Sequence, residues 1–177
     1  MDKKTINVVF ASDNNYVKYT AVTLASLLKN LSKDRVINVF VLTDEPISTT
    51  NLTGLRALQS LHPFMFHNLV VDASDFSRVR TTPGISIATY YRLVMHRILP
   101  DELSRVLYLD SDLIIRKCIS GIYDVDLAGK AFAGVEDSRS IDYNRKFGTP
   151  EDAPHINAGV TLVDLDAVRS MDFSARV

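Results

Sequence analysis

The sequence has one cysteine, no tryptophan and no long hydrophobic run. A single thiol cannot form an internal disulfide framework, so we expect Cys118 to be a buried structural thiol in a reducing compartment. The apolar run near the N-terminus stops at Asp13 and is too short for a signal-peptide core or a membrane span. These absences predict a soluble cytoplasmic protein. Any peripheral attachment to the inner face of the cell membrane would come from parts of the protein outside this chain.

An excess of positive charge is also missing. The 20 Lys and Arg residues are balanced by 21 Asp and Glu residues, which gives a formal net charge of −1. Nucleic-acid-binding domains normally carry a basic patch or stripe, so we expect no nucleic-acid partner.

Glycine-rich phosphate loops and metal-binding histidine motifs are absent as well. No Gly-x-Gly-x-x-Gly or Gly-x-x-x-x-Gly-Lys-Ser/Thr motif follows the first apolar run, which excludes the common dinucleotide-binding and P-loop classes. The four histidines show no zinc-ligand spacing, and no local motif indicates a Ser-His-Asp or Cys-His hydrolase. A phosphate-bearing ligand would therefore have to be held by a metal ion and by side chains.

The remaining composition is that of an ordinary globular domain, with 46% hydrophobic and 23% charged residues. Short apolar runs predict buried strands at residues 6–11, 37–42, 65–71, 106–109, 131–135 and 158–163. Helical periodicity predicts helices at 17–31, 52–61 and 89–99, and another helix opening at 165–168; residues 74–84 and 138–154 read as polar loops. This alternation indicates an α/β domain with a central, mostly parallel sheet flanked by helices. We expect a single domain, residues 1–177, truncated at its C-terminus.

Acidic or amide residues follow several of the predicted strands: Asp13, Asn15, Asp44, Asp72, Asp110, Asp112 and Asp137. In open α/β sheets, ligands bind outside the carboxyl ends of the strands, so this distribution predicts a polar crevice at one edge of the sheet. An Asp after a strand can instead cap a helix or turn the chain. For Asp44 and Asp72 we prefer that structural interpretation.

The triplet Asp110-Ser111-Asp112 stands out because apolar residues flank it on both sides. Two carboxylates in such a place are costly unless their charge is compensated. If the strand at 106–109 continues, its period of two puts both carboxylates on the same side, where Mg²⁺ or Mn²⁺ can bind them together with substrate phosphates. A metal site and a capped turn both remain open at this point.

Three other positions carry a ligand-binding and a structural interpretation. Tyr16 could stack on a nucleobase while Asp13 and Asn15 bond its edge or ribose, or it could pack over the first helix. Arg92 could hold a phosphate or carboxylate bidentately, or form an ion pair on a helix face. Asn157, in Asn157-Ala158-Gly159-Val160, could bind sugar hydroxyls where glycine permits close approach, or form a strand-entry turn. His155 is beside this segment, and its role stays open.

The combination of these segments resembles the family 8 glycosyltransferases, which include lipopolysaccharide α-galactosyl- and α-glucosyltransferases. The matching segments occur in the family's order and approximate spacing and extend over essentially the whole chain: residues 10–16, 85–93, 106–112 and 157–160. The resemblance implies a GT-A type nucleotide-diphospho-sugar transferase fold. It also implies retaining transfer of a hexose, galactose or glucose, from a UDP-sugar to a saccharide acceptor such as lipopolysaccharide or lipooligosaccharide.

The resemblance also implies roles for individual residues. Uracil and ribose would be held by Ala11, Asp13, Asn15 and Tyr16. The triplet Asp110-Ser111-Asp112 would take the diphosphate, with Asp110 and Asp112 as ligands of Mn²⁺ (or Mg²⁺). Arg92, Asp137 and Asn157 would form the catalytic set around the donor sugar and the acceptor.

The chain also departs from the family. Members carry a further metal-binding histidine and a Gln-Asp pair beyond the last strand seen here, and this chain ends before them. Gly84, after Pro83, would alter acceptor contacts. We therefore expect the chain alone to be weak or inactive as a transferase. The alternatives are a non-catalytic UDP-sugar-binding module and a receiver-like signalling domain with an acidic phosphoacceptor pocket.

Overall fold

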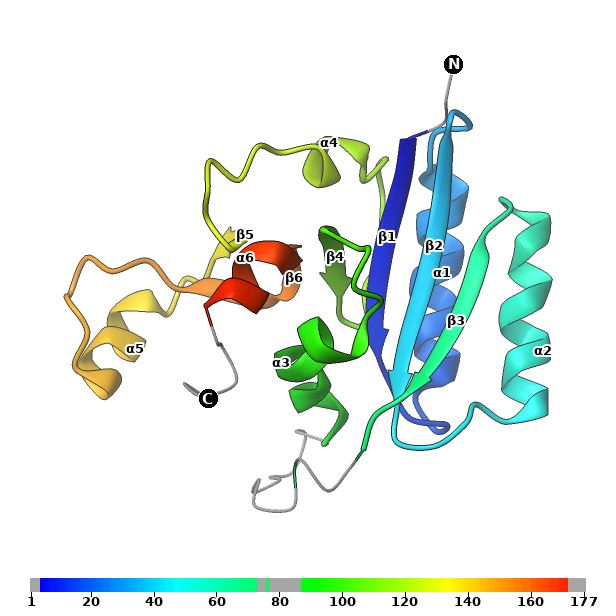
Figure 1. Cartoon of the computed structure of the whole chain (residues 1–177), viewed down its shortest axis with the longest axis horizontal. Coiled ribbons are helices and arrows are strands. Elements are labelled where there is room, and N and C mark those ends of the chain that lie inside the picture. Colours follow the sequence, from blue (N-terminus) through cyan, green and yellow to red (C-terminus); the bar gives the residue numbers. More distant parts are fainter. Residues whose placement is uncertain (1–3, 73–75, 77–86, 172–177) are drawn as a thin grey trace.

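The computed structural model describes residues 4–72, 76 and 87–171 (Figure 1). Most of the predicted loop at 74–84, including Pro83-Gly84, lies outside these residues. Within these residues the strands are β1 (Lys4–Ala11), β2 (Arg35–Thr43), β3 (Met65–Val70), β4 (Arg105–Leu109), β5 (Phe132–Glu136) and β6 (Ile156–Asp164). The helices are α1 (Val17–Asn30), α2 (Thr49–Ala57), the 3₁₀ turn η1 (Leu58–Ser60), α3 (Ala88–Ile98), α4 (Ser120–Tyr123), α5 (Ser140–Phe147) and α6 (Leu165–Ser170).

The strands form one mixed sheet in the order β3-β2-β1-β4-β6-β5. Strands β1 to β4 are mutually parallel, whereas β6 runs antiparallel to both β4 and β5. The carboxyl ends of β1 and β4 therefore meet the first residues of β6 at one edge. This arrangement confirms the expected α/β class with a central, mostly parallel mixed sheet.

The two faces of the sheet bury separate hydrophobic cores. On one face, Ile6, Val8 and Phe10 of β1 pack with apolar residues of α1 and α2. On the other face, Val9 and Ala11 pack with α3 and α6. Both faces are covered, which explains why these strands read as continuous apolar runs rather than as alternating patterns.

Helix α5 corrects the prediction of a polar loop at 138–154. Its two buried residues are polar, Ser140 and Asn144, while Ile141 and Phe147 are exposed. Hydrophobic periodicity therefore gives no signal there, because the apolar side chains do not face the core. Gly148, which reads as a loop residue in the sequence, ends the helix in the left-handed conformation with φ of 67°.

The expectation for Cys118 was also wrong. Its thiol is exposed and lies 3.2 Å from the hydroxyl of Ser120, at the start of the short helix α4. Among the described residues, no helix is long and apolar enough to cross a membrane.

Candidate functional site

The candidate site lies at the sheet edge where β1 and β4 end and β6 begins (Figure 1). The amide of Asp110 donates a 2.8 Å hydrogen bond to the carbonyl oxygen of Gly159, which joins the residue after β4 to the first part of β6. The antiparallel pairing of these two strands continues from there, with Leu109 opposite Val160. The topology thus gathers residues that are far apart in the sequence.

The loop after β1 is organised by Asp13. Its Oδ1 accepts hydrogen bonds of 2.8 Å from the amides of both Asn15 and Tyr16, and its carbonyl oxygen accepts one of 3.0 Å from the amide of Val17. One carboxylate oxygen of Asp13 therefore turns the chain before α1, which is one of the two structural interpretations; the N-cap of α1 is Tyr16, whose side chain makes no cap hydrogen bond. The same turn leaves Asn15 and the Tyr16 ring exposed at the site.

Asn14 is a residue that the sequence reading missed. Its side-chain amide donates to the Glu45 carboxylate at 2.7 Å, and its Oδ1 accepts from the amide of Ser48 at 2.8 Å. Asn51 of α2 donates to the Asn14 carbonyl oxygen at 2.8 Å. These bonds tie the loop after β1 to the loop after β2. The Asn14-Asn15 pair at a strand end was the only local signal for this role.

The acidic triplet forms a turn, because β4 ends at Leu109 and the residues Ser111 and Asp112 no longer follow the strand. The predicted strand periodicity therefore does not extend to Asp112. Ser111 is 5% exposed; its hydroxyl donates to the carbonyl oxygen of Ala11 at 3.0 Å and accepts from Thr20 at 2.9 Å. The side chain of Ser111 anchors the turn to β1 and α1, and Asp112 is left exposed.

Helix α1 holds the segment after the turn through a row of polar side chains. The hydroxyl of Thr23 accepts from the amide of Leu113 at 2.9 Å and lies 2.8 Å from its carbonyl oxygen. Ser26 accepts from the amide of Ile115 at 2.8 Å, and Asn30 donates to the Ile115 carbonyl oxygen at 2.9 Å. Side chains of α1 thus bond backbone groups of Leu113 and Ile115 that, in a sheet, a neighbouring strand would bond. Polar residues spaced three or four apart on a mostly apolar helix were the available signal.

Arg92 of α3 connects α3, the end of β4 and the start of β6. Its Nη2 lies 3.1 Å from Asp110 Oδ1, and its Nη1 donates to the carbonyl oxygen of Ala158 at 2.8 Å. The guanidinium also lies over the ring of Tyr108, with Cζ 4.6 Å from the ring centroid. This geometry is the ion pair of the structural interpretation. It also presents a cation at the acidic turn.

Tyrosine hydroxyls donate to both carboxylates of the triplet. Tyr108 donates to Asp110 Oδ1 at 3.1 Å, and Tyr16 donates to Asp112 Oδ2 at 3.0 Å. Burial raises the pKa of Tyr108 well above its ordinary value, and the hydrogen bond to Asp112 raises the pKa of Tyr16. Both hydroxyls therefore remain protonated near neutral pH and act as donors.

Gly159 leaves room for the carboxylate of Asp110. A Cβ on Gly159 would stand 2.6 Å from Asp110 Oδ2 and 3.1 Å from Asn157 Oδ1. Asn157 Oδ1 also accepts a 2.9 Å hydrogen bond from the amide of Gly159. The close approach that the sequence interpretation allowed for at this glycine is present, and it is made to the protein's own acidic turn.

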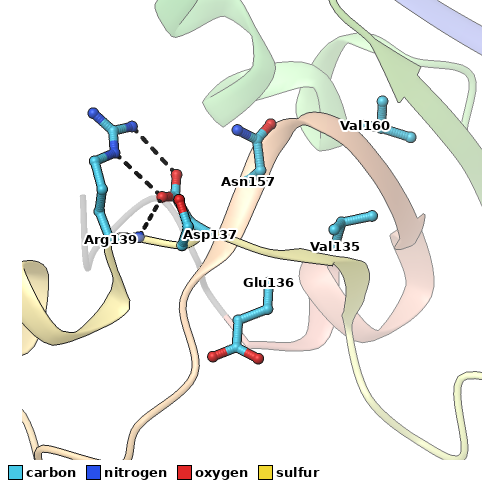
Figure 2. Close-up of a pocket in the computed structure, with 7 residues that line it drawn as sticks. Val135, Glu136, Asp137, Arg139, Asn157 and Val160 are labelled. Atoms are coloured by element: carbon cyan, nitrogen blue, oxygen red, sulfur yellow. Dashed lines mark hydrogen bonds and ion pairs between the residues drawn. The ribbon is translucent and has the colours of Figure 1, made fainter.

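A cavity of about 390 Å³ opens where β5 ends and β6 begins (Figure 2). It is lined by Val135, Glu136, Asp137, Ser138, Arg139, Asn157 and Val160. Figure 2 shows the carboxylate of Asp137 beside the side chain of Asn157, with Glu136 directed the other way. The cavity offers a carboxylate, a carboxamide and a guanidinium to a polar ligand.

Asp137 is paired with Arg139 inside this cavity. Asp137 Oδ1 accepts from the Arg139 backbone amide at 2.9 Å and from Nε at 3.2 Å. These bonds, aided by Asn157, hold the pKa of the Asp137 carboxyl below its ordinary value. Asp137 is therefore an anion and a hydrogen-bond acceptor at neutral pH.

His155, whose role the sequence left open, belongs to the framework behind the cavity. Its Nε2 lies 2.6 Å from Oδ1 of Asn144, and its backbone carbonyl oxygen accepts from the amide of Asp137 at 2.7 Å. Asn144 is 1% exposed and donates to the carbonyl oxygens of Glu151 and Ala153, each at 2.9 Å. Helix α5 and the loop that follows it are thereby fixed behind Asp137.

The residues present suit a divalent cation shared with a ligand. Among the described residues, no group of three His, Cys, Asp or Glu side chains could hold a metal ion by itself. Asp110 and Asp112 offer two carboxylates, and Gly159 has no Cβ, which would stand 2.6 Å from Asp110 Oδ2. Mg²⁺ and Mn²⁺ typically take one or two carboxylates and complete their coordination with water and substrate phosphates. The donor set fits that pattern.

Known proteins resemble this chain in sequence and in fold. Residues 7–177 match the family model described as glycosyl transferase family 8. The structure of the galactosyltransferase LgtC in complex with donor and acceptor sugar analogues superimposes with a TM-score of 0.84 and 30% sequence identity, covering 96% of this chain and 62% of that chain. This similarity confirms the expected GT-A type fold.

Two curated relatives are more distant in sequence. General stress protein A of Bacillus subtilis is 24% identical over 173 residues, covering 97% of this chain and 60% of the relative. The lipopolysaccharide 1,3-galactosyltransferase of Salmonella typhimurium is 24% identical over 170 residues, covering 93% of this chain and 50% of the relative. The chain thus spans between half and about three fifths of the length of these relatives and of LgtC.

Proposed function

The chain belongs to glycosyltransferase family 8, and we propose that it carries the donor-binding half of a metal-dependent, retaining hexosyltransferase that uses a UDP-sugar. The observation that carries this proposal is the position of Asp110. Its carboxylate lies against the Arg92 guanidinium and against Gly159, where β4 ends and β6 begins. An acidic turn with a nearby cation and an open side suits a nucleotide diphosphate held through a metal ion.

We propose that the nucleoside binds at the loop after β1. Asn15 and the Tyr16 ring are exposed there, and the backbone turn is fixed by Asp13. An exposed aromatic face can stack on uracil, and the second carboxylate oxygen of Asp13 can accept from the base edge or from ribose. Ala11, which closes β1 below this loop, would border the base. The Ser111 hydroxyl would support the turn from within.

The hexose would then extend toward the cavity in Figure 2. Asn157 offers a donor and an acceptor to sugar hydroxyls, and the ionised Asp137 accepts from a hydroxyl of the donor or of the acceptor. A bound Mn²⁺ or Mg²⁺ would supply the charge that neutralises the departing diphosphate. Arg92 would add a fixed positive charge next to that group, where electrostatic stabilisation is most effective. Arg92, Asp137 and Asn157 are therefore our proposed catalytic residues.

For the acceptor we propose a saccharide such as lipopolysaccharide or lipooligosaccharide, with galactose or glucose as the transferred hexose. The support is the similarity to LgtC and to the lipopolysaccharide 1,3-galactosyltransferase. A cytoplasmic location, peripheral to the inner face of the membrane, would give access both to UDP-sugars and to a growing lipid-linked acceptor. It stays a prediction.

Calorimetric titration with UDP, with and without Mn²⁺, tests the donor site. We expect Mn²⁺ to strengthen UDP binding to the wild type and to have no such effect on Asp110→Ala/Asp112→Ala. Asp101→Asn, which changes an exposed carboxylate between α3 and β4, is the matched control and should behave as the wild type. Absence of UDP binding, or an equal effect of Mn²⁺ on the double variant, would reject the assignment.

A second assay separates an enzyme from the alternative, a non-catalytic UDP-sugar-binding module. Turnover of UDP-galactose or UDP-glucose is measured as the release of UDP, in the presence of Mn²⁺ and a saccharide acceptor. Turnover that depends on Asp110 supports the enzyme. If the full-length protein binds UDP-sugar and gives no turnover, the module is favoured.

A further inference from the structure

The two carboxylates of the acidic turn have unequal partners. Asp110 is bonded by Arg92 and by Tyr108, whose ring is 2% exposed and fixed in the core. Asp112 is bonded at 3.0 Å by the hydroxyl of Tyr16, whose side chain is exposed at the entry to α1. An exposed aromatic side chain changes rotamer rapidly, whereas a buried one is held by its packing. The donor on Asp112 can therefore leave, and the donors on Asp110 are held in place.

The hydroxyl of Tyr16 occupies part of the coordination space of Asp112. A hydrogen atom pointing at Oδ2 lies where a cation bound to that oxygen would lie, and both are attracted by the same lone pairs. A cation that binds Oδ2 through the lone pair that accepts this hydrogen bond therefore displaces the hydroxyl. The Tyr16 ring contacts the Tyr19 ring, with centroids 4.6 Å apart at an angle of 45°.

We propose that Tyr16 is a latch that couples cation binding to nucleotide binding. Without a cation, the Tyr16 hydroxyl holds the Asp112 carboxylate and keeps the ring against the acidic turn. Cation binding releases the ring, which becomes available to a nucleobase, and a nucleobase on the ring removes the competitor from Asp112. This inference rests on the proposed donor site and adds a mechanism by which its two halves communicate.

Linkage makes the coupling measurable in both directions. If the cation increases UDP affinity by some factor, UDP must increase cation affinity by the same factor. The latch predicts that part of this factor comes from the Tyr16 hydroxyl. Removing the hydroxyl should therefore strengthen cation binding to the nucleotide-free protein and should weaken the coupling.

Mn²⁺ binding to the nucleotide-free chain, measured by electron paramagnetic resonance of the free ion, tests the latch without relying on activity. A hydrogen bond to a charged group changes an equilibrium constant by at most about ten- to a hundredfold. We therefore expect Tyr16→Phe to bind Mn²⁺ about three- to tenfold more tightly than the wild type. Tyr19→Phe, which removes the hydroxyl of the neighbouring ring, is the matched control and should leave Mn²⁺ affinity unchanged. In the background of Asp112→Asn, Tyr16→Phe should give no gain.

The outcomes separate the latch from the donor site itself. Wild-type protein that binds neither Mn²⁺ nor UDP rejects the proposed function, and the latch with it. Wild-type protein that binds both, with Tyr16→Phe equal to it in Mn²⁺ affinity, rejects the latch alone. Weaker Mn²⁺ binding by Tyr16→Phe also overturns the latch, because the hydroxyl would then support the ligand rather than compete for it.

Discussion

The backbone of Gly159 lies directly against the carboxylate of Asp110: the Gly159 carbonyl oxygen accepts from the Asp110 amide at 2.8 Å, and a Cβ on Gly159 would stand 2.6 Å from Oδ2. Real Cβ atoms do not approach an oxygen so closely, so a side chain here must displace the carboxylate of Asp110. The absence of a side chain at Gly159 thus allows the proposed metal-binding carboxylate of Asp110 to lie against β6, the strand that carries Asn157.

Gly159→Ala is expected to weaken Mn²⁺-dependent UDP binding at least about tenfold, because Asp110 must rotate away from its present position. Calorimetry measures this loss. Gly54→Ala is the control, since a Cβ at that position in α2 meets no atom within 4 Å. It should leave binding intact and stabilise the fold by about 0.5–1 kcal/mol through the helix preference of alanine. Unchanged UDP binding in Gly159→Ala would contradict the role assigned to this contact.

Arg92→Met is expected to lose both the ion pair with Asp110 and the hydrogen bond to the Ala158 carbonyl oxygen. We expect a stability loss of about 1–3 kcal/mol in urea unfolding, together with weaker UDP binding. Arg92→Lys keeps the charge but cannot reach Asp110 and Ala158 together, so it should recover only part of either property. Full recovery by lysine would show that charge alone matters at this position.

Thr23→Val replaces a fully buried hydroxyl with a methyl group of similar size. It removes the partner of the Leu113 amide and of the carbonyl oxygens near the turn, so we expect a loss of about 2–4 kcal/mol of stability. Thr53→Val on the exposed side of α2 also loses one hydroxyl bond to the backbone but should cost well under half as much. Equal losses in thermal unfolding would show that the Thr23 contacts are not special. A selective loss of Mn²⁺ affinity in Thr23→Val would show that they position Asp112.

The pair of Asp137 and Arg139 predicts a pH-dependent contribution to stability. Because the pKa of the Asp137 carboxyl is lowered in the folded state, this contribution is present above the ordinary carboxyl pKa and is lost as the pH falls through the lowered folded value. Arg139→Gln should therefore lower the melting temperature slightly near neutral pH, with the difference from wild type vanishing in acid. Arg145→Gln, in the last turn of α5, the helix that Arg139 precedes, is the control. A difference that grows toward low pH would have the wrong sign for this pair.

Much of the fold could be predicted from local patterns. Strands such as 6–11 and 37–42 appear as continuous apolar runs because helices cover both sheet faces. A serine before a helix is a common N-cap, and Ser48 takes that place before α2, accepting from the amide of Asn51 at 3.3 Å. Helix α5 could not be found in this way, because its contacts with the protein are made by Ser140 and Asn144 while its apolar residues face outward.

The candidate site was likewise predicted only in part from the sequence. Asp13, Tyr16, Arg92, Asp110, Asp112, Asp137 and Asn157 were singled out from residue type and position, and the structure brings them to one edge of the sheet. Their roles toward a ligand remain predictions. Asn14, Thr23 and Asn144 were missed because their importance comes from the backbone groups that they bond, and these belong to other segments.

The sequence by itself determined the α/β class, most of the elements and the chemistry available at the strand ends, since each depends on local periodicity and residue type. Only the tertiary structure decided which of those groups meet. Tyr16 and Asp112 are 96 residues apart and are joined because β1 and β4 are adjacent and parallel. Gly159 meets Asp110 because β6 runs antiparallel to β4 in a particular register. Strand order and register are properties of the whole sheet, so no local pattern could specify these contacts.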